Sequence, residues 1–407
     1  MTRRNLISTA GAAFTAVSQS RIWGANERLS IALIGCGARG LQLQPHFQKL
    51  NAPLTAVCDL WRTRAEKAQS LAAGSRVFDD HRKVLEIPGL DAVIIATSDH
   101  WHARIAVDAL SAGKDVYVEK PLTRTIEEGV GIINAARANN RVCQVGAQQR
   151  SGTHYMQARD EYIKPGKLGK IHLVRTWWND GLSSGQARAA SAVAPTGGHS
   201  VPPGLTTKPD DLDWNRYVAP VRWRPWNPPQ FFNFRNYMDF CGGILTDKYV
   251  HWVDVVHMFL GEDVPLTADT AGGIYAAKDG RTVPDTLNVH YEYPGNWVCT
   301  YTNVPQAGLQ REGIEFCGTQ AHLRIDRTKF EVFPSDAREK PLVVECKTDL
   351  VEEHVANFIG CVKSRKMPNG DVEMGHRSAI AAHLGNLSWI ERRRVRFDSE
   401  RELVLPA

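Results

Sequence analysis

Three side chains that can hold a charge or move a proton stand at two places in the chain. Lys120 follows a predicted buried strand, while Asp247 and His251 follow a glycine pair and lie four residues apart. On a helix Asp247 and His251 share one face, and Asp254 and His257 continue near it. A lysine can stabilise a developing alkoxide, a histidine can take a hydroxyl proton, and a carboxylate can orient both. The pattern favours oxidation of a hydroxyl group; polar pairing on a helix, or a pair of metal ligands, is the alternative.

A glycine-rich turn near the N-terminus predicts the partner that such a reaction needs. A short apolar run at 31–34, typical of a buried strand, leads directly into Gly35-Cys36-Gly37-Ala38-Arg39-Gly40. Gly35 allows a tight turn, Gly37 lets a pyrophosphate approach the backbone, and Gly40 lets the next helix lie close to the sheet. The N-terminus of that helix favours phosphate. A glycine-rich turn in some other α/β domain is the alternative to dinucleotide binding.

An acidic residue completes this pattern. Asp59 ends the next predicted strand, at 54–58, about twenty residues beyond the glycines. Its carboxylate can accept hydrogen bonds from an adenosine ribose, and its charge would repel a 2′-phosphate. We therefore expect NAD as the cofactor, with NADP as the alternative because Arg62 lies close in the sequence.

Strand and helix patterns alternate as far as residue 150. Strands are predicted at 91–97, 115–118 and 142–145, with helices at 62–73, 101–112 and 125–139. This alternation is typical of a doubly wound parallel sheet, which binds ligands at the carboxyl ends of its strands. Thr97, Lys120 and Gln148 all fall just beyond such ends. We expect residues 27–150 to form a dinucleotide-binding domain.

From residue 151 the pattern changes to that of an antiparallel sheet. Residues 171–178 predict a strand, and 287–293 and 297–301 predict a hairpin around Pro294-Gly295-Asn296, a theme that 316–333 repeats. We expect 151–407 to form a substrate-binding and oligomerisation domain with a large, mostly antiparallel sheet that is open on one face. Two late helices, near 352–362 and 375–391, should pack back on the body of the protein.

Residues 180–236 predict an irregular insertion that is rich in aromatic side chains. Flat aromatic rings suit the C–H face of a sugar, although the core of an irregular segment has the same composition. The aromatic side chains in and beside the insertion are Trp177, Trp178, Trp214, Trp223, Trp226, Phe231, Phe232, Phe234 and Tyr237.

Composition excludes several classes of function. The 407 residues are 43% hydrophobic and 23% charged, as in an ordinary globular protein, and the net charge of +5 is small for this length. The sequence contains no block of Lys and Arg residues, so it does not predict a nucleic-acid partner. The eight cysteines are scattered without a C-x-x-C pair, so they are interpreted as small core residues and not as disulfides or metal ligands.

The first residues predict export. Arg3 and Arg4 precede a mildly apolar run, from Leu6 to Val17, that is too short to span a bilayer. Paired arginines before such a run are typical of a twin-arginine signal, which carries folded proteins, and a chance pair in an ordinary N-terminus is the alternative. We expect 1–26 to be the signal and the mature protein to be periplasmic or otherwise exported, without a membrane span.

Taken together, these motifs resemble the glucose–fructose oxidoreductase / inositol dehydrogenase (Gfo/Idh/MocA) family over nearly the whole chain after the signal. The resemblance rests on the glycine turn, Glu119-Lys120-Pro121, the run 145–150 and the Asp247-x-x-x-His251 helix. It implies a Rossmann domain followed by an α/β domain with a large open sheet, commonly buried in a dimer or tetramer. It also implies that Lys120, Asp247 and His251 form the catalytic group.

The resemblance further implies the set of cofactor-binding residues and one departure from the family. The family's usual T-P-N-x-x-H is here Thr97-Ser98-Asp99-His100-Trp101-His102, so an acid replaces an amide near the cofactor. No metal ligands are expected. The implied cofactor-binding residues are Gly35, Gly37, Ala38, Arg39, Gly40, Asp59, Thr97, His102, Glu119, Lys120 and Gln148.

The leading hypothesis is an oxidoreductase that moves a hydride between a sugar or polyol carbon and tightly bound NAD. Two rivals remain. One is a glycoside hydrolase that oxidises a sugar transiently, eliminates the glycoside and returns the hydride. The other is a cofactor-holding binding or sensor protein without turnover, which the presence of Lys120, Asp247 and His251 disfavours.

Overall fold

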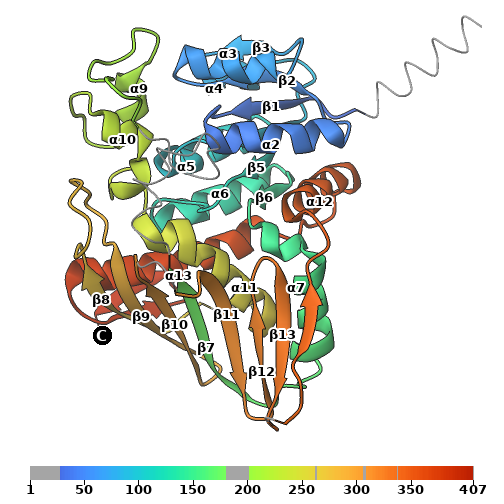
Figure 1. The fold of residues 1–407 in the computed structure, drawn as a ribbon. Coiled ribbons are helices and arrows are strands. Elements are labelled where there is room, and N and C mark those ends of the chain that lie inside the picture. The colour runs from blue at the N-terminus through green and yellow to red at the C-terminus, as the bar shows by residue number, and fades with distance from the viewer. Residues whose placement is uncertain (1–27, 180–200, 262–263, 306–308, 337, 407) are drawn as a thin grey trace, which may run out of the picture.

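The computed structural model describes residues 28–179, 201–261, 264–305, 309–336 and 338–406. A six-stranded sheet and a ten-stranded sheet form its two halves, and helices α11 (Val250–Leu260) and α13 (Val372–Glu391) lie between the large sheet and the smaller half (Figure 1). The α/β class expected from the sequence is confirmed. The expected export signal, and the first part of the aromatic insertion, lie outside the described residues.

The six-stranded sheet is parallel throughout, with the order β3-β2-β1-β4-β5-β6. β2 and β3 are added on one side of β1, and β4 to β6 are added on the other side. The point between β1 and β4 is therefore the switch point, at which a doubly wound sheet binds its ligands. Only β3, a three-residue strand, and α4 (His81–Leu85) after it were not predicted. The strands are β1 (Ile31–Ile34), β2 (Leu54–Cys58), β3 (Arg76–Phe78), β4 (Ala92–Ile95), β5 (Asp115–Val118) and β6 (Cys143–Val145).

Helices cover both faces of this sheet. On one face α2 (Ala38–Lys49) and α3 (Arg62–Ser70) pack on the strands, together with α12 (Leu350–Ser364) from the far end of the chain. On the other face lie α4, α5 (His102–Ser111) and α6 (Glu127–Ala138). In α12, Phe358 meets the rings of Phe47 and Tyr117, with centroids 6.2 and 5.7 Å apart. Both late helices were predicted, but no pattern in the sequence indicated that α12 would cover one face of the first sheet.

The ten-stranded sheet has the order β14-β13-β12-β11-β7-β10-β9-β8-β15-β16, and every neighbouring pair is antiparallel except β7 and β10. Along β9, Leu287, Val289, Tyr291 and Tyr293 are buried under α11 and α13, while the side chains between them are exposed. The strands are β7 (Ile171–Trp178), β8 (Thr267–Gly273), β9 (Thr286–Tyr293), β10 (Trp297–Asn303), β11 (Glu312–Gly318), β12 (Ala321–Ile325), β13 (Lys329–Pro334), β14 (Leu342–Glu345), β15 (Val395–Asp398) and β16 (Leu403–Pro406).

Short helical segments connect the two halves. Two of them are π-helices, a rare form that is often found at functional sites. The segments are η1 (Asp99–Trp101), η2 (Gln148–Ser151), α7 (Thr153–Ala158), the π-helix η3 (Arg159–Ile163), α9 (Trp214–Val218), α10 (Pro228–Phe232), η5 (Phe234–Asn236) and the π-helix η6 (Leu245–Tyr249).

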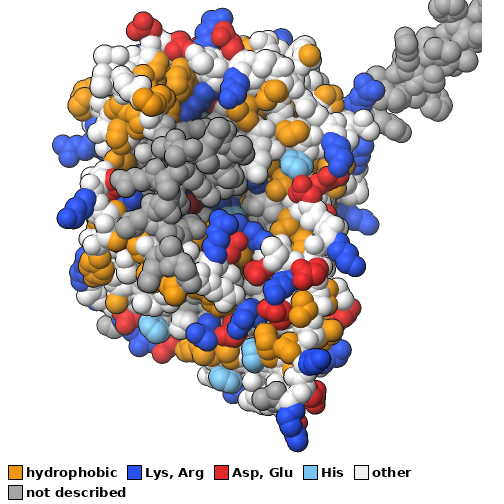
Figure 2. Space-filling model, viewed as in Figure 1, with side chains coloured by type: hydrophobic (Ala, Val, Ile, Leu, Met, Phe, Trp, Pro, Cys, Tyr) orange, Lys and Arg blue, Asp and Glu red, His pale blue; other side chains and the backbone are white. Residues whose placement is uncertain are grey.

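The surface and the cysteines agree with the composition. Acidic and basic side chains are intermingled on the face shown in Figure 2, and apolar side chains gather over the α9–α10 region. All eight cysteines are free, and six of them are buried. Among the described residues, none of the helices combines the length and the apolar character needed to cross a bilayer.

Candidate active site

The glycine turn after β1 has the geometry that a phosphate requires. Gly35 has φ +94°, and a Cβ there would lie 2.6 Å from the backbone of Ala96. A Cβ on Gly37 would meet nothing nearer than the Arg64 guanidinium at 3.9 Å, so the backbone is open on that side. No side chain caps the N-terminus of α2. This open turn and helix N-terminus therefore suit an approaching pyrophosphate.

Asp59 is held against this turn. Its Oδ2 accepts from the backbone N–H of Cys36 at 2.8 Å, and its Oδ1 accepts from that of Trp61 at 2.9 Å. Each carboxylate oxygen has a second lone pair, so hydrogen bonds from a ribose remain available. Burial raises the pKa of Asp59, and the charge of Arg64 opposes that rise. The acid therefore stands where the adenosine half of a dinucleotide would lie.

Arg64 is the cation beside Asp59, and this corrects the expectation for Arg62. The Arg62 guanidinium points to solvent, where its Nε bonds Glu66 at 2.7 Å. Arg64 lies over the ring of Phe231 at 4.5 Å. Helical spacing explains the difference, because positions 62 and 64 point to different faces of α3.

Thr97 and His102 follow β4. The Thr97 Oγ1 is buried and has no hydrogen-bond partner among the described residues. His102 places Nδ1 2.7 Å from the carbonyl oxygen of Pro121 and Nε2 3.2 Å from that of Thr97. The imidazole thus ties the turn after β4 to the turn after β5. Thr97 keeps a polar atom for a ligand, whereas His102 acts through the backbone of Thr97.

Glu119, Arg39 and Gln148 form a chain across three strand ends. Nε of Arg39 donates to Glu119 Oε1 at 2.7 Å. Nε2 of Gln148 donates to the same oxygen at 3.3 Å and to the Tyr117 hydroxyl at 3.2 Å. A Cβ on Gly146 would lie 2.8 Å from Glu119, so the carboxylate fills the space beside the glycine. These hydrogen bonds link the start of α2 to the ends of β5 and β6.

These features fit a dinucleotide. The open glycine turn would take the pyrophosphate, Asp59 would take the adenosine ribose, and the Thr97 hydroxyl lies free at the end of β4. No metal is needed for this fit. One group, His46, Asp349 and Glu352, has ligand atoms within 4.8 Å of one another at the outer surface. There Asp349 caps α12 and Glu352 pairs with Lys49 at 2.6 Å, so both carboxylates already have partners.

Lys120 and Asp247 meet at the same edge of the sheet. Nζ of Lys120 donates to Oδ1 of Asp247 at 2.8 Å and to its backbone carbonyl at 2.6 Å. Asp247 lies in the π-helix η6, and His251 lies in the first turn of α11. Burial alone would raise the pKa of Asp247, but the charges of Lys120 and Arg235 outweigh it and hold that pKa well below its usual range. The carboxylate is therefore ionised.

Two further residues lie beside Asp247. The sequence marked Asp99 as an acid near the cofactor but not as a neighbour of Asp247, and it did not select Arg235. Nε of Arg235, from the described part of the aromatic insertion, donates to the same Oδ1 at 2.9 Å. Asp99, only 3% exposed, lies in the electrostatic field of Arg235, Lys120 and Asp247. Burial raises the pKa of Asp99 to about 7, although the two cations oppose the rise. The signal for Asp99 was its departure from the family's asparagine, whereas no pattern marks Arg235.

His251 is a neutral imidazole at this edge. Burial, and then the charge of Lys120, lower its pKa well below the usual value. Its Nδ1 is buried without a hydrogen-bond partner among the described residues, and its ring stacks on Trp178 at 5.9 Å. Trp178 also meets Trp252 at 5.5 Å. The tryptophan that was a candidate for sugar stacking therefore braces the histidine.

Asp254 and His257 continue along α11 but lie outside the site. Nε of Arg150 donates to Asp254 Oδ2 at 2.8 Å in an ion pair with both side chains 3% exposed. His257 Nε2 lies 2.9 Å from the Tyr293 hydroxyl. Asp247 and His251 therefore lie near Lys120, whereas Asp254 and His257 belong to the packing of the second half.

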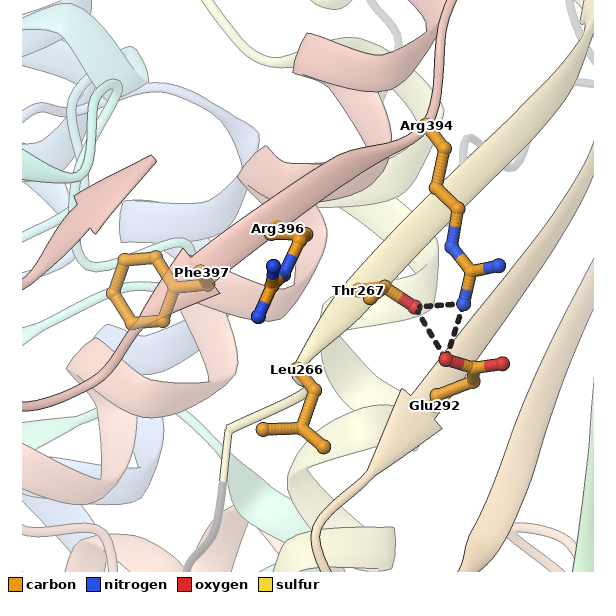
Figure 3. A pocket seen from close by; sticks show the side chains of 6 residues that line it. All are labelled: Leu266, Thr267, Glu292, Arg394, Arg396 and Phe397. Atoms are coloured by element: carbon orange, nitrogen blue, oxygen red, sulfur yellow. Dashed lines mark hydrogen bonds and ion pairs between the residues drawn. The ribbon is translucent and has the colours of Figure 1, made fainter. Parts of the chain in front are cut away.

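A pocket of about 470 Å³ lies far from these residues, at the β8–β9–β15 end of the large sheet (Figure 3). Arg394 crosses it to pair with Glu292 and to donate to Thr267 at 3.0 Å. None of the expected site residues lines it. The charged groups of this pocket, Arg394 and Glu292, already pair with each other, so the candidate active site is the strand-end edge that carries Lys120.

Comparison with known proteins gives the family. Residues 29–147 match the model of an oxidoreductase family's NAD-binding Rossmann fold, and 196–406 match that of its C-terminal alpha/beta domain. A scyllo-inositol 2-dehydrogenase (NAD(+)) of Bacillus subtilis (strain 168) is 35% identical over 144 residues, which are 34% of this chain and 42% of that protein. The glycosyl hydrolase family 109 protein 2 of Shewanella sp. (strain ANA-3) is 35% identical over 129 residues, 29% of this chain and 28% of that one.

These two curated relatives are matched over less than half of their own length. Among solved structures, a levoglucosan dehydrogenase in complex with NADH and levoglucosan superposes with a TM-score of 0.71 and 18% identity, covering 91% of this chain and 99% of that one. At this identity the likeness shows the fold. Because the family models match both halves, the chain belongs to the Gfo/Idh/MocA oxidoreductase family, and its first half is that family's NAD-binding Rossmann domain.

Proposed function

We propose that the protein transfers a hydride between a hydroxyl-bearing carbon of a sugar or polyol and NAD. The observation that carries this proposal is the Lys120–Asp247 ion pair, with Nζ 2.8 Å from Oδ1, at the same strand-end edge as the glycine turn. The dehydrogenases among the relatives and neighbours, which are named for inositols and levoglucosan, support the substrate class.

Each residue has a distinct role in this proposal. Bound NAD supplies the hydride acceptor. His251, neutral because of burial and Lys120, accepts the hydroxyl proton, and the Lys120 ammonium stabilises the alkoxide as the carbonyl forms. Asp247 keeps Lys120 oriented and charged. Trp178 holds the His251 ring so that the imidazole reaches the hydroxyl in one orientation.

NAD is proposed to be preferred over NADP. The Asp59 carboxylate lies against the glycine turn, where it would accept from a ribose and repel a 2′-phosphate. Arg64, which is close enough to weaken that repulsion, is turned onto Phe231. The preference therefore rests on the acid.

Redox-assisted hydrolysis of a glycoside is the second candidate. It is favoured by the relative named as a glycosyl hydrolase family 109 protein, whose identity over the matched region equals that of the inositol dehydrogenase. It is also favoured by Asp99, a second carboxyl group beside Lys120 that could take the proton next to a transient ketone. We place the oxidoreductase first because the Lys120, Asp247 and His251 pattern is the dehydrogenase one.

Location and assembly extend the proposal. The paired Arg3 and Arg4 support export through the twin-arginine route. A homodimer or homotetramer is proposed from membership of the family, because the open sheet that the resemblance implies is commonly buried against a second copy.

The test uses the purified protein with the nucleotide that it carries. A panel of polyols, sugars and glycosides is added while absorbance is followed at the band of reduced nicotinamide. We expect one polyol or sugar to reduce the nucleotide and to be recovered oxidised. Glycoside cleavage with deuterium from heavy water on the carbon beside the transient ketone would establish the hydrolase instead. No response to any of these compounds, with nucleotide bound, would overturn both candidates.

A further inference from the structure

Residues 205–241, which we name the strap, follow β7 in sequence but lie against the Rossmann half. Figure 1 shows α9 and α10 beside the first sheet and away from the strands of the large sheet. The strap has an apolar core of its own, and Leu60 and Trp61 from the loop after β2 pack against it. A piece of the second half therefore covers the loop that carries Asp59.

Backbone hydrogen bonds join the strap to this loop. The N–H of Arg62 donates to the carbonyl of Asp211 at 3.1 Å, and the N–H of Asp213 donates to that of Leu60 at 3.0 Å. These bonds flank an isolated antiparallel bridge between the two segments. The loop that begins at Asp59 therefore has its backbone fixed from outside the Rossmann half.

The side chain of Asp211 strengthens this attachment. Its Oδ2 accepts from the N–H of Thr63 at 2.9 Å and from its hydroxyl at 2.6 Å. Its Oδ1 accepts from the Trp61 indole at 3.0 Å. Asp211 thus supplies a carboxylate at the N-terminus of α3, where the partial positive charge of the helix favours it. One residue of the strap holds both the loop and the start of α3.

Aromatic contacts continue the attachment towards the glycine turn. Phe231 and Phe232 each lie 5.8 Å from the Trp61 ring, edge to face. The Arg64 guanidinium, which stands nearest to Gly37, lies over Phe231 at 4.5 Å. The strap therefore fixes the cation that stands beside the expected phosphate and ribose positions.

Two more attachments lie at other strand ends. The His100 ring and the Trp101 indole both donate to the carbonyl of Tyr217, at 2.8 and 3.0 Å, just after β4. Arg216 donates to the carbonyl of Asp79, just after β3, at 2.6 Å. The strap thus reaches the carboxyl ends of β2, β3 and β4, the edge at which a doubly wound sheet binds its ligand.

The far end of the strap reaches the catalytic residues through Arg235, whose Nε lies 2.9 Å from Asp247 Oδ1. One segment therefore runs from the loop that carries Asp59 to Asp247, beside the proposed site of hydride transfer. Its attachments are backbone bonds, charge-assisted bonds and ring contacts, so release of one of them leaves the others in place.

We propose that the strap covers the nucleotide-binding edge of the first sheet and retains the nucleotide through many turnovers. This inference rests on the proposed function and specifies its kinetic form. A retained nucleotide cannot leave to be reoxidised, so the hydride taken from one sugar carbon must go to a second carbonyl substrate in the same site or back to the first. In the first route the sugar loses two electrons and the second carbonyl substrate gains them. In the second route the same sugar loses two electrons and then regains them. Neither route consumes added nucleotide.

The test measures exchange of the nucleotide. The full-length protein is purified without added nucleotide, its bound NAD is quantified, and isotopically labelled NAD is then added. We expect close to one nucleotide per chain and slow uptake of label. Asp211→Ala and the milder Phe231→Leu should each speed uptake by roughly tenfold or more, because charge-assisted bonds or ring contacts are lost. Wild-type protein that exchanges as fast as Asp211→Ala would overturn the proposal.

Asp336→Ala is the matched control. Asp336 is a partly exposed aspartate that, among the described residues, bonds Arg338, two residues away, with Nε 2.9 Å from Oδ1. Neither residue belongs to the strap or to the first sheet. The control variant should exchange as slowly as the wild type. Folding of each variant is checked by its melting temperature. Reduction of the bound nucleotide by a sugar is recorded separately, so slow exchange without reduction would reject the proposed function and keep the strap, and the converse result would do the opposite.

Discussion

Nε of Arg235 and Nζ of Lys120 donate to the same carboxylate oxygen of Asp247, at 2.9 and 2.8 Å. A substrate hydroxyl that draws Lys120 forward would leave Asp247 partly unpaired, and Arg235 would still hold its charge and its position. Arg235 is thus a positioning residue supplied by the strap.

Replacing Arg235 with Gln should lower kcat roughly tenfold to a hundredfold, because a charge-assisted bond to Asp247 is lost. The acid limb of the pH–rate profile should move to higher pH, since the pKa of Asp247 rises when one of its two cations is removed. Arg235→Lys should restore part of both. The control is Arg175→Gln, which breaks an ion pair with Glu315 on the large sheet. A profile for Arg235→Gln that matches this control would contradict the positioning role.

Lys120→Ala and His251→Ala should each slow hydride transfer by roughly 10²–10⁴, the usual contribution of a general acid or base. Bound nucleotide should be retained, because neither Lys120 nor His251 is one of the residues through which the strap is attached to the first sheet. Single-turnover absorbance and nucleotide content are measured on the same samples. His172→Ala, on the exposed side of β7, is the control. If His251→Ala turned over normally, the proton would have to go to another group.

Asp59→Asn should improve the binding of NADP relative to NAD by roughly tenfold, which corresponds to about 1.4 kcal/mol. The amide keeps an acceptor for Cys36 or Trp61 and removes the repulsion of a 2′-phosphate. Arg62→Ala should leave the preference unchanged because its side chain points to solvent. Competition between the two nucleotides during reloading provides the measurement, and an unchanged ratio in Asp59→Asn would remove the acid from the selection of cofactor.

Asp99 makes the stability depend on pH. Burial raises its folded pKa to about 7, whereas the unfolded value is about 3.9. Between these values the native state holds a proton that the unfolded state has lost. The stabilising contribution is therefore complete below about pH 4 and disappears as the pH rises through about 7. Over the whole range it amounts to roughly 4 kcal/mol.

Asn resembles the protonated acid, so Asp99→Asn should be more stable than the wild type at pH 8 and nearly equal to it at pH 4. Urea unfolding at several pH values measures the difference. Asp269→Asn, at an exposed position on β8, should show no such trend. A constant difference between wild type and Asp99→Asn across the pH range would mean that Asp99 stays ionised in the folded protein.

Changing Arg3 and Arg4 to lysines should keep the protein in the cytoplasm if the twin-arginine interpretation is right. The apolar run after the arginines is weak, so general secretion should not replace the lost route efficiently. Fractionation of cells that express the two forms gives the result. Equal export of the double mutant would remove the argument for transport in the folded state.

Much of the fold could be predicted because local sequence patterns indicate its strands and helices. The apolar runs that became β1, β2, β4 and β5 and the hairpin of β9 and β10 have the length and alternation of strands. The short β3 and the strands β15 and β16 carry little pattern of their own. β3 is held by its pairing with β2, β15 by its pairing with the distant β8, and β16 by its pairing with β15.

The site was predictable to the extent that motifs mark it. Lys120 and Asp247 were expected to act together, and they are in contact. The contributions of Arg235, Arg64 and Trp178 depend on tertiary packing, because a single arginine or tryptophan in an irregular segment carries no spacing signal. The same limit explains why Asp254 and His257 seemed to extend the site: periodicity gives the face of a helix but not what covers it.

The placement of α12 has a consequence for the synthesis of the protein. Residues 350–364 complete one face of the first sheet, where Phe358 covers Phe47 and Tyr117, two side chains that are fully buried. α2 and α3 cover the rest of that face, but the part under α12 stays open until nearly the whole chain has left the ribosome. The N-terminal half therefore cannot finish folding before the C-terminal half is made. The usual order in which an N-terminal domain matures first does not apply, and a fragment that ends at residue 150 would lack a wall of its own core.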